Sequence, residues 1–195
     1  MILPIVAYGA HILKKKAKDV TLNPSELTPF IENLWETMYA ASGVGLAAPQ
    51  VGHSKRIFII DASPFADDEN FDASEQLALK EFKEVFINPT IIEETGEEWP
   101  FNEGCLSIPN IREDVIRPDQ LSIRYTNSDW EEKEETFTGL AARIIQHEYD
   151  HIEGILFTDR LSSLKKRLLK GKLSQIAKGK VDVDYVMRFP NELKL

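Results

Sequence analysis

Gln146-His147-Glu148-Tyr149-Asp150-His151 is the stretch around which the predicted fold is organised. We expect Thr138 to cap a helix that ends at Gly154, which places two imidazoles on one face, where both can bind one metal ion. Glu148 lies about 100° further round the axis, where its carboxylate can contact a metal-activated water without binding the metal. Histidine pairs on helices also occur as ordinary surface or core residues, so the motif alone leaves metal binding open.

The composition is that of a soluble globular protein. The chain has 195 residues, of which 43% are apolar and 28% charged, which fits one domain over 1–195. No apolar run approaches the ~20 residues that span a bilayer, and no signal peptide is recognisable, so we expect a cytoplasmic protein with no membrane partner. The net charge of -9 argues against DNA as a partner.

One segment departs from the acidic balance of the chain. Seven basic residues and no acidic one lie between positions 161 and 181, namely Lys165, Lys166, Arg167, Lys170, Lys172, Lys178 and Lys180. A solvated helix face explains this pattern, and so does a docking surface. Leu164, Leu168, Leu169, Leu173 and Ile176 are predicted to form the apolar stripe of a helix over 161–178.

The first half of the chain predicts a helix and a close-approach loop. Thr28 as cap and Pro29 at the first helical position predict a helix that ends before residue 42, after a short helical turn near 11–16. An earlier start at 23–24 would place Pro29 inside the helix at a cost of ~3 kcal/mol. Two glycines and a proline make 43–50 a loop whose N–H groups can face a ligand, with a plain helix C-cap and turn as the alternative.

Short β-branched and alternating segments predict the sheet. Strands are expected at 56–61, 85–88, 90–95, 114–117, 121–126 and 134–138, with a hairpin turn at 127–129. The acidic, turn-rich segment 63–83 is expected to be a surface insertion, and 181–195 is a tail without a clear pattern. The economical fold is α+β: one domain with mixed or antiparallel sheets packed around the metal-binding helix, flanked by an N-terminal and a C-terminal helix.

Cys105 supplies the third ligand type that the histidine pair needs. A thiolate and two imidazoles bind a borderline divalent cation and leave the fourth tetrahedral position open for water, as a catalytic site requires. An inert buried thiol is the alternative for Cys105. The helix copies the spacing of metzincin peptidases, but Phe157 stands where they need a third histidine. His11 and His53 have no supporting pattern and are expected at the surface or in the core.

Three stretches together resemble the peptide deformylases: the loop at 43–50, Glu-Gly-Cys-Leu-Ser at 103–107 and the helix motif at 146–151. The resemblance implies hydrolysis of the N-formyl group from the formyl-methionine of new polypeptides, with release of formate. It also implies Cys105, His147 and His151 as metal ligands and Glu148 as general base and later acid, acting on the metal-bound water that attacks the formyl carbon.

The same resemblance implies an oxyanion site and a methionine pocket. The Gln50 amide and the Leu106 N–H would hold the formyl oxygen, one such donor being worth about 3 to 4 kcal/mol. The backbone at Gly45 would pair with the substrate strand, and Arg112 would contact the peptide beyond the methionine. The walls of the methionine slot are expected to be Val44, Phe101, Leu140 and Ile144.

The resemblance leaves several points open. Arg143 stands where many bacterial members carry an apolar residue, so it either swings outward or narrows the slot. The ligands suit zinc, iron, nickel or cobalt, and the family points to one Fe²⁺ per chain. A peptidase and a structural metal-binding module are the rival hypotheses. The basic helix over 161–180 is a candidate for docking on ribosomes, where formyl-Met polypeptides emerge.

Overall fold

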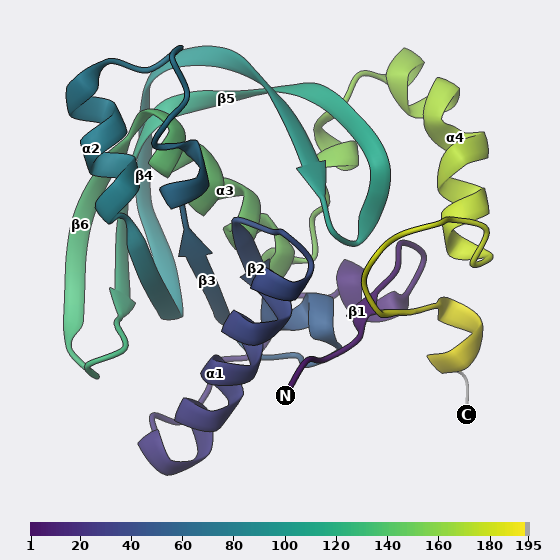
Figure 1. Cartoon of the computed structure of the whole chain (residues 1–195), viewed down its shortest axis with the longest axis horizontal. Coiled ribbons are helices and arrows are strands. Elements are labelled where there is room, and N and C mark those ends of the chain that lie inside the picture. Colours follow the sequence, from purple (N-terminus) through teal and green to yellow (C-terminus); the bar gives the residue numbers. More distant parts are fainter. Residues whose placement is uncertain (194–195) are drawn as a thin grey trace.

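A five-stranded antiparallel sheet and the helix that packs against it form the centre of the computed structural model, which describes residues 1–193 (Figure 1). The strand order is β2-β3-β4-β5-β6. These strands are β2 Gly45–Ala47, β3 Ile57–Asp61, β4 Lys83–Cys105, β5 Ile108–Thr126 and β6 Glu132–Thr138. The α-helices are α1 Pro24–Ala40, α2 Ala73–Glu81, α3 Gly139–Glu153 and α4 Ser163–Ala177. The predicted α+β fold class is confirmed.

Helix α3 begins and ends where the sequence predicts. Thr138 is its N-cap residue, and Gly154 closes it in the left-handed conformation at φ 76°. A Cβ at Gly154 would lie 2.8 Å from the backbone carbonyl carbons of Lys14 and Lys15, so the N-terminal arm crosses directly over this end. Because α3 is enclosed by the sheet, 10 of its 15 residues are buried, including polar ones.

Strands β4 and β5 are much longer than predicted, and together they bend over α3 (Figure 1). The expected pairs of strands at 85–88 and 90–95, and at 114–117 and 121–126, each merge into one strand. The register shifts between Ile87 and Thr90 and between Thr95 and Glu98. Proline and glycine in these stretches therefore mark bulges that bend the ladder, and they do not end it.

Helix α1 begins earlier than predicted. Pro24 is its first residue, Asn23 is the N-cap and Pro29 lies inside the helix, so the predicted start at Thr28 is wrong. The proline costs about 3 kcal/mol, but it removes a bond only near the exposed N-terminal end. The extra turn buries Leu27 against the sheet beside Ile31, and full burial of one leucine contributes about 1.5 to 3 kcal/mol. The cost of the proline and the gain from burying Leu27 are of similar size, so the earlier start changes the free energy of folding little.

The predicted loop at 43–50 contains an edge strand. β2 pairs with β3 in antiparallel register, Gly45 opposite Ile60, and the 3-10 helix Ala48–Val51 follows. Small residues do not prevent strand pairing, because the ladder uses only the backbone. Since β2 is the first strand in the sheet order, its other edge is free of any strand among the described residues.

The segment 63–83 is more ordered than a turn-rich insertion. It forms the 3-10 helix Ser63–Phe65 and α2, whose N-cap Asp72 accepts hydrogen bonds from the N–H groups of Ser74 and Glu75, both at 2.9 Å. Most of the segment is exposed, as expected, but Leu79 is buried in the core cluster that also contains Phe86.

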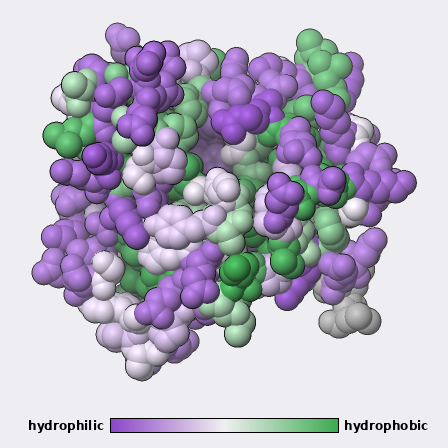
Figure 2. Space-filling view, viewed as in Figure 1, coloured by the Kyte–Doolittle hydropathy of each residue, from purple (hydrophilic) through white to green (hydrophobic). Residues whose placement is uncertain are grey.

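Helix α4 presents two separate apolar faces. Leu169, Leu173 and Ile176 are buried against the N-terminal arm and the β4–β5 hairpin, whereas Leu164 and Leu168 are 63% and 71% exposed. At 100° per residue the two groups point about 125° apart, so the predicted single stripe of five residues is wrong. Hydrophobic residues accordingly appear on the surface over the start of α4, at the upper right of Figure 2.

The two ends of the described chain lie side by side. Strand β7 Met187–Arg188 pairs in parallel with β1 Ile5–Val6, and the 3-10 helices His11–Lys14 and Pro190–Leu193 adjoin them. The predicted tail 181–195 is therefore structured up to residue 193, and its last two positions lie outside the described residues. Between residues 1 and 193, no helix combines the length and the apolar character that a bilayer crossing requires.

Candidate active site

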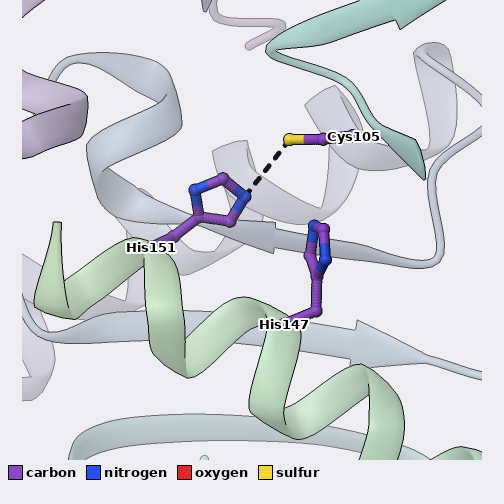
Figure 3. Close-up of side chains that lie close together, drawn as sticks. All are labelled: Cys105, His147 and His151. Atoms are coloured by element: carbon purple, nitrogen blue, oxygen red, sulfur yellow. Dashed lines mark hydrogen bonds between the residues drawn. The ribbon is translucent and has the colours of Figure 1, made fainter. Parts of the chain in front are cut away.

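Three donor side chains meet at the middle of α3 (Figure 3). His147 and His151 project from one face of α3, and Cys105 faces them from the end of β4. The donor atoms all lie within 4.8 Å of one another, and Cys105 Sγ is 3.2 Å from His151 Nε2. Tetrahedral zinc with bonds of about 2.0 to 2.3 Å separates its donors by about 3.5 Å. The side chains therefore fit a four-coordinate cation without large movement.

Glu103 orients the first of the two imidazoles. Its Oε2 lies 2.9 Å from His147 Nδ1, which leaves His147 Nε2 to face the cation site. Arg117 donates from Nε and Nη2 to the two oxygens of the same carboxylate, at 2.7 and 2.9 Å. Burial opposes ionisation of Glu103, but the hydrogen bonds from Arg117 and His147 outweigh it and hold the pKa of Glu103 well below its usual range. Glu103 is therefore a fixed anion.

The second imidazole is neutral. Burial lowers the pKa of His151 well below its usual value, and the positive charge of Arg117 acts in the same direction. Its Nδ1 is buried and has no hydrogen-bond partner within residues 1–193. A neutral imidazole is the form that binds a metal.

Glu148 lies beside the donors with one oxygen unengaged. The side chain is 4% exposed, and its Oε2 has no hydrogen-bond partner among the residues that the structure describes. Burial raises the pKa of Glu148 to about 7. A Cβ on Gly45 would lie 2.4 Å from Glu148 Oε1, so only glycine at that position leaves room for the carboxylate.

Gln50 is held so that its amide nitrogen faces the donors. Its Oε1 accepts the N–H of Ala47 at 2.8 Å, which fixes the orientation of the amide. Nε2 lies 3.5 Å from both Cys105 Sγ and Ser107 Oγ, at the limit of hydrogen bonding. The amide therefore retains capacity for a further acceptor in the cleft.

The donors open into a cleft of about 820 Å³ between the end of α1, the β4–β5 hairpin and residues 182–185. Five predicted substrate residues line it: Val44, Gly45, Phe101, Arg112 and Ile144. Gln50, Leu106, Cys105, His147 and Glu148 line it as well. Leu140 does not, because it lies two turns before His147 and packs in the core with Ile123 and Ile145.

Arg143 points inward. It is 1% exposed, donates to Glu103 Oε1 at 3.1 Å and to the carbonyl of Val115 at 3.0 Å, and lies over the Trp99 ring at 4.6 Å. Burial lowers the pKa of Arg143, and the charge of Glu103 opposes that effect. An outward swing is therefore excluded, and Arg143 borders the cleft while supporting the carboxylate that holds His147.

Comparison with known proteins identifies the family. The model of the family described as polypeptide deformylase matches residues 2–167. The chain belongs to the polypeptide deformylase family. Two named peptide deformylases are similar over nearly the whole chain. The one from Christiangramia forsetii is 63% identical and covers 100% of this chain and 99% of its own length; the one from Flavobacterium johnsoniae is 57% identical and covers 97% and 96%.

Solved deformylase structures share the fold. The crystal structure of a peptide deformylase from Legionella pneumophila is 35% identical, has a TM-score of 0.76 and covers 92% of this chain and 98% of that one. The peptide deformylase from Thermotoga maritima is 38% identical, has a TM-score of 0.71 and covers 83% and 99%. The family match ends at residue 167, so 182–185 border the cleft from outside the matched part of the deformylase sequence.

Several residues of the site had no assigned role at the level of sequence. Glu103 lies inside the Glu-Gly-Cys-Leu-Ser motif. A histidine that binds a metal through one nitrogen usually donates from the other to a carboxylate or carbonyl, and this requirement could have pointed to Glu103. Phe65, from the segment expected to be a surface insertion, borders the cleft. Asp182, Val183, Asp184 and Tyr185 also border it, and nothing in their pattern indicates this position. His11 and His53 lie apart from the donor cluster and are exposed, in accord with expectation.

Proposed function

We propose that this enzyme removes the N-formyl group from the formyl-methionine of new polypeptides, at a divalent cation held by Cys105, His147 and His151. Family membership supports removal of the formyl group. The observation that carries the site assignment is the convergence of three donor atoms within 4.8 Å, beside the unengaged carboxylate of Glu148. Ferrous iron is the proposed ion in the cell, and zinc, nickel and cobalt suit the same donors.

Glu148 is proposed to carry the proton. When bound, the cation lowers the pKa of water to about 7 and polarises the formyl oxygen. Glu148 takes a proton from the attacking water and returns it to the leaving amine of methionine. Its buried Oε2 supports this role, because no donor in the described part of the chain hydrogen-bonds to it and it is free to accept the proton.

Gln50 and Leu106 are proposed to stabilise the developing negative charge. The Ala47 N–H fixes the Gln50 amide with its nitrogen toward Cys105, so the donor needs no reorganisation when the formyl oxygen gains charge. Leu106 follows Cys105 in the chain and lines the same cleft. Removing one donor of this kind costs about 3 to 4 kcal/mol of barrier.

The cleft is proposed to bind the peptide as an added strand. Gly45 begins the edge strand β2 and Val44 directly precedes it, so the outer edge of β2 can pair with the substrate backbone. Phe101 and Ile144 form apolar walls for the methionine side chain, with Leu140 supporting them from the core. Arg112 lines the cleft, donates to Asn102 Oδ1 at 2.9 Å, and is proposed to contact the peptide beyond methionine.

A formate assay with matched variants tests the proposal. Protein loaded anaerobically with Fe(II) is incubated with a formyl-Met tripeptide, and formate is measured for wild type, Glu148→Gln and Glu153→Gln. Glu153 lies on the same helix, but its carboxylate pairs with Arg56 at 2.6 Å and with Lys16 at 2.9 Å, outside the cleft. We expect wild type and Glu153→Gln to release formate and Glu148→Gln to lose about 10²- to 10⁴-fold in rate. Equal rates for wild type and Glu148→Gln contradict the assigned role, and no formate from wild type contradicts the function.

The basic surface of α4 is proposed to dock on ribosomes. Lys166, Arg167 and Lys170 are exposed, whereas Lys165 pairs with Glu113 at 2.8 Å. Clustered lysine and arginine bind phosphate-rich surfaces in a salt-dependent way. Docking on ribosomes would place this single-domain enzyme in the cytoplasm, where formyl-Met polypeptides emerge.

Ribosome co-sedimentation at two salt concentrations tests the docking. Neutralising Lys166, Arg167 and Lys170 to glutamine is expected to reduce binding and its salt dependence. The control neutralises Lys14, Lys15 and Lys16 of the exposed N-terminal arm, which changes the net charge by the same amount elsewhere. Docking through α4 is refuted if both triple variants bind as wild type does.

A further inference from the structure

The C-terminal segment returns to the active site after α4. We call residues 181–188 the C-terminal strap. It begins beyond the family match, which ends at residue 167, and it ends in β7 beside β1 (Figure 1). The N–H groups of Ile5 and Ala7 donate to the carbonyls of Val186 and Arg188, both at 2.9 Å. The strap is thus tied to the N-terminal arm while its residues 182–185 border the cleft.

Tyr185 makes the contact that joins the strap to the catalytic turn. Its hydroxyl donates to the Leu106 carbonyl at 2.7 Å. Leu106 and Ser107 are the two residues that connect β4 to β5, directly after Cys105. The Ser107 carbonyl is held from the other end of the chain, by the N–H of Tyr8 at 2.8 Å. Both carbonyls of this turn are therefore fixed by segments outside the sheet.

The turn needs such support because its own strands do not supply it. The β4–β5 register shifts between Gly104 and Cys105, and the ladder stops at the pair Cys105 and Ile108. Rotation of the Leu106 backbone would redirect the Leu106 N–H and, at the same time, shift the Cys105 thiol. Misplacement of reacting groups by about 1 Å costs on the order of 10²-fold in rate.

The Tyr185 hydroxyl is a permanent donor. The ring is half-buried, and this burial together with the nearby Cys105 raises the pKa of Tyr185 to about 12. The phenol therefore stays protonated at physiological pH and donates to the carbonyl throughout. A second bond, from Asn110 Nδ2 to the Asp182 carbonyl at 3.2 Å, ties the strap to β5 beyond the turn.

We propose that Tyr185 is a positioning residue of the active site, which holds the Leu106 carbonyl and thereby orients the Leu106 N–H and the Cys105 thiolate. The inference rests on the proposed function, because that function assigns these two groups as oxyanion donor and metal ligand. It gives the strap a role in the reaction in addition to its place as a wall of the cleft. Tyr185 touches neither substrate nor cation in this role.

Tyr185→Phe isolates the hydroxyl, because it keeps the ring and its packing. We expect kcat to fall about tenfold with KM within about twofold, since an oxyanion donor acts mainly in the transition state. The cobalt-loaded variant should also show shifted ligand-field and thiolate-to-cobalt absorption bands, because the Cys105 sulfur changes its orientation. The matched control is Tyr125→Phe, which removes a hydroxyl bonded to Glu135 Oε2 at 2.9 Å, away from the cleft. It should retain the wild-type kcat and spectrum.

The outcomes separate this inference from the function on which it rests. Active wild type with a reduced kcat and a shifted cobalt spectrum only in Tyr185→Phe supports the positioning role. Wild-type kcat per bound cobalt and an unchanged spectrum in Tyr185→Phe overturn it while leaving the proposed function intact. Absence of formate release from metal-loaded wild type instead refutes the proposed function.

Discussion

Replacing Glu103 with glutamine removes a buried negative charge that contacts three side chains, those of Arg117, Arg143 and His147. Glu103 accepts two hydrogen bonds from Arg117, one from Arg143 at 3.1 Å and contacts His147 Nδ1 at 2.9 Å. The amide keeps the shape of the side chain, but it presents an NH₂ group to donors on one side. Both arginines are 1% exposed, so neither can recover its lost partner from water.

The magnitude follows from the charges that remain. After the change, Arg117 and Arg143 lie in the interior with only the Asp150 carboxylate, which Arg160 also engages. Removing one partner of a buried ion pair costs about 3 to 5 kcal/mol. At about 2 to 4 °C per kcal/mol for a chain of this length, Tm should fall by about 6 to 20 °C. Metal affinity should fall about 10- to 100-fold, because His147 loses the group that orients it.

Two measurements on Glu103→Gln check these values. The Tm of the metal-free protein measures how much the buried ion pairs stabilise the fold. Competition with a chelator measures the affinity for the cation. The control is Glu113→Gln, since Glu113 lies opposite Glu103 across the hairpin and pairs with Lys165 at the surface. That partly exposed pair is worth less than about 1 kcal/mol, so the control should behave as wild type. A Glu103→Gln protein that matches the control in both measurements refutes the reasoning.

Three further substitutions test other parts of the structure. Gly45→Ala places a Cβ 2.4 Å from Glu148 Oε1, so steady-state assays should show a loss of about 10²-fold in kcat; an unchanged kcat would show that the carboxylate moves freely. Gly154→Ala forces φ 76° on alanine against backbone, and denaturant unfolding should show a loss of about 2 kcal/mol or more, whereas a neutral result contradicts the tight crossing. Burial raises the pKa of Glu84, so its ionised form destabilises the folded state above that pKa. Glu84→Gln should therefore raise Tm at pH 7, with a gain that shrinks toward about pH 4; a gain independent of pH refutes this cause.

The helix that carries the histidines was predictable because its signals are local. Thr138 and Gly154 are close in sequence to the segment they delimit, and the spacing of His147 and His151 fixes their common face. Cys105 was predictable as a partner by its chemistry, since it is the single thiol in the chain. The structure brings these three residues together, and their roles remain proposals that the formate and metal assays test.

The parts that sequence reasoning missed depend on tertiary contacts. The start of α1 at Pro24 follows from burial of Leu27 against the sheet, which local helix rules do not include. The inward position of Arg143 depends on a carboxylate 40 residues earlier, at Glu103, and on carbonyls of β4 and β5. Tyr185 reaches the Leu106 turn only because β7 pairs with β1. None of these pairings leaves a periodic or motif signal in the sequence.

The buried charges around α3 favour a cation of charge two. Arg117 and Arg143 balance Glu103 and Asp150 in the interior, whereas Arg160, which also pairs with Asp150, is 37% exposed, so the buried part of this network is neutral by itself. The groups that remain are the Cys105 thiolate and the Glu148 carboxylate, which bring two negative charges when both are ionised. An unbalanced charge in the interior is costly, so a monovalent or trivalent ion would leave a residual charge that a divalent ion does not. We infer that the arginine network keeps Glu103 and Asp150 out of this balance, so that a divalent cation bound by the Cys105 thiolate beside the Glu148 carboxylate leaves no residual charge.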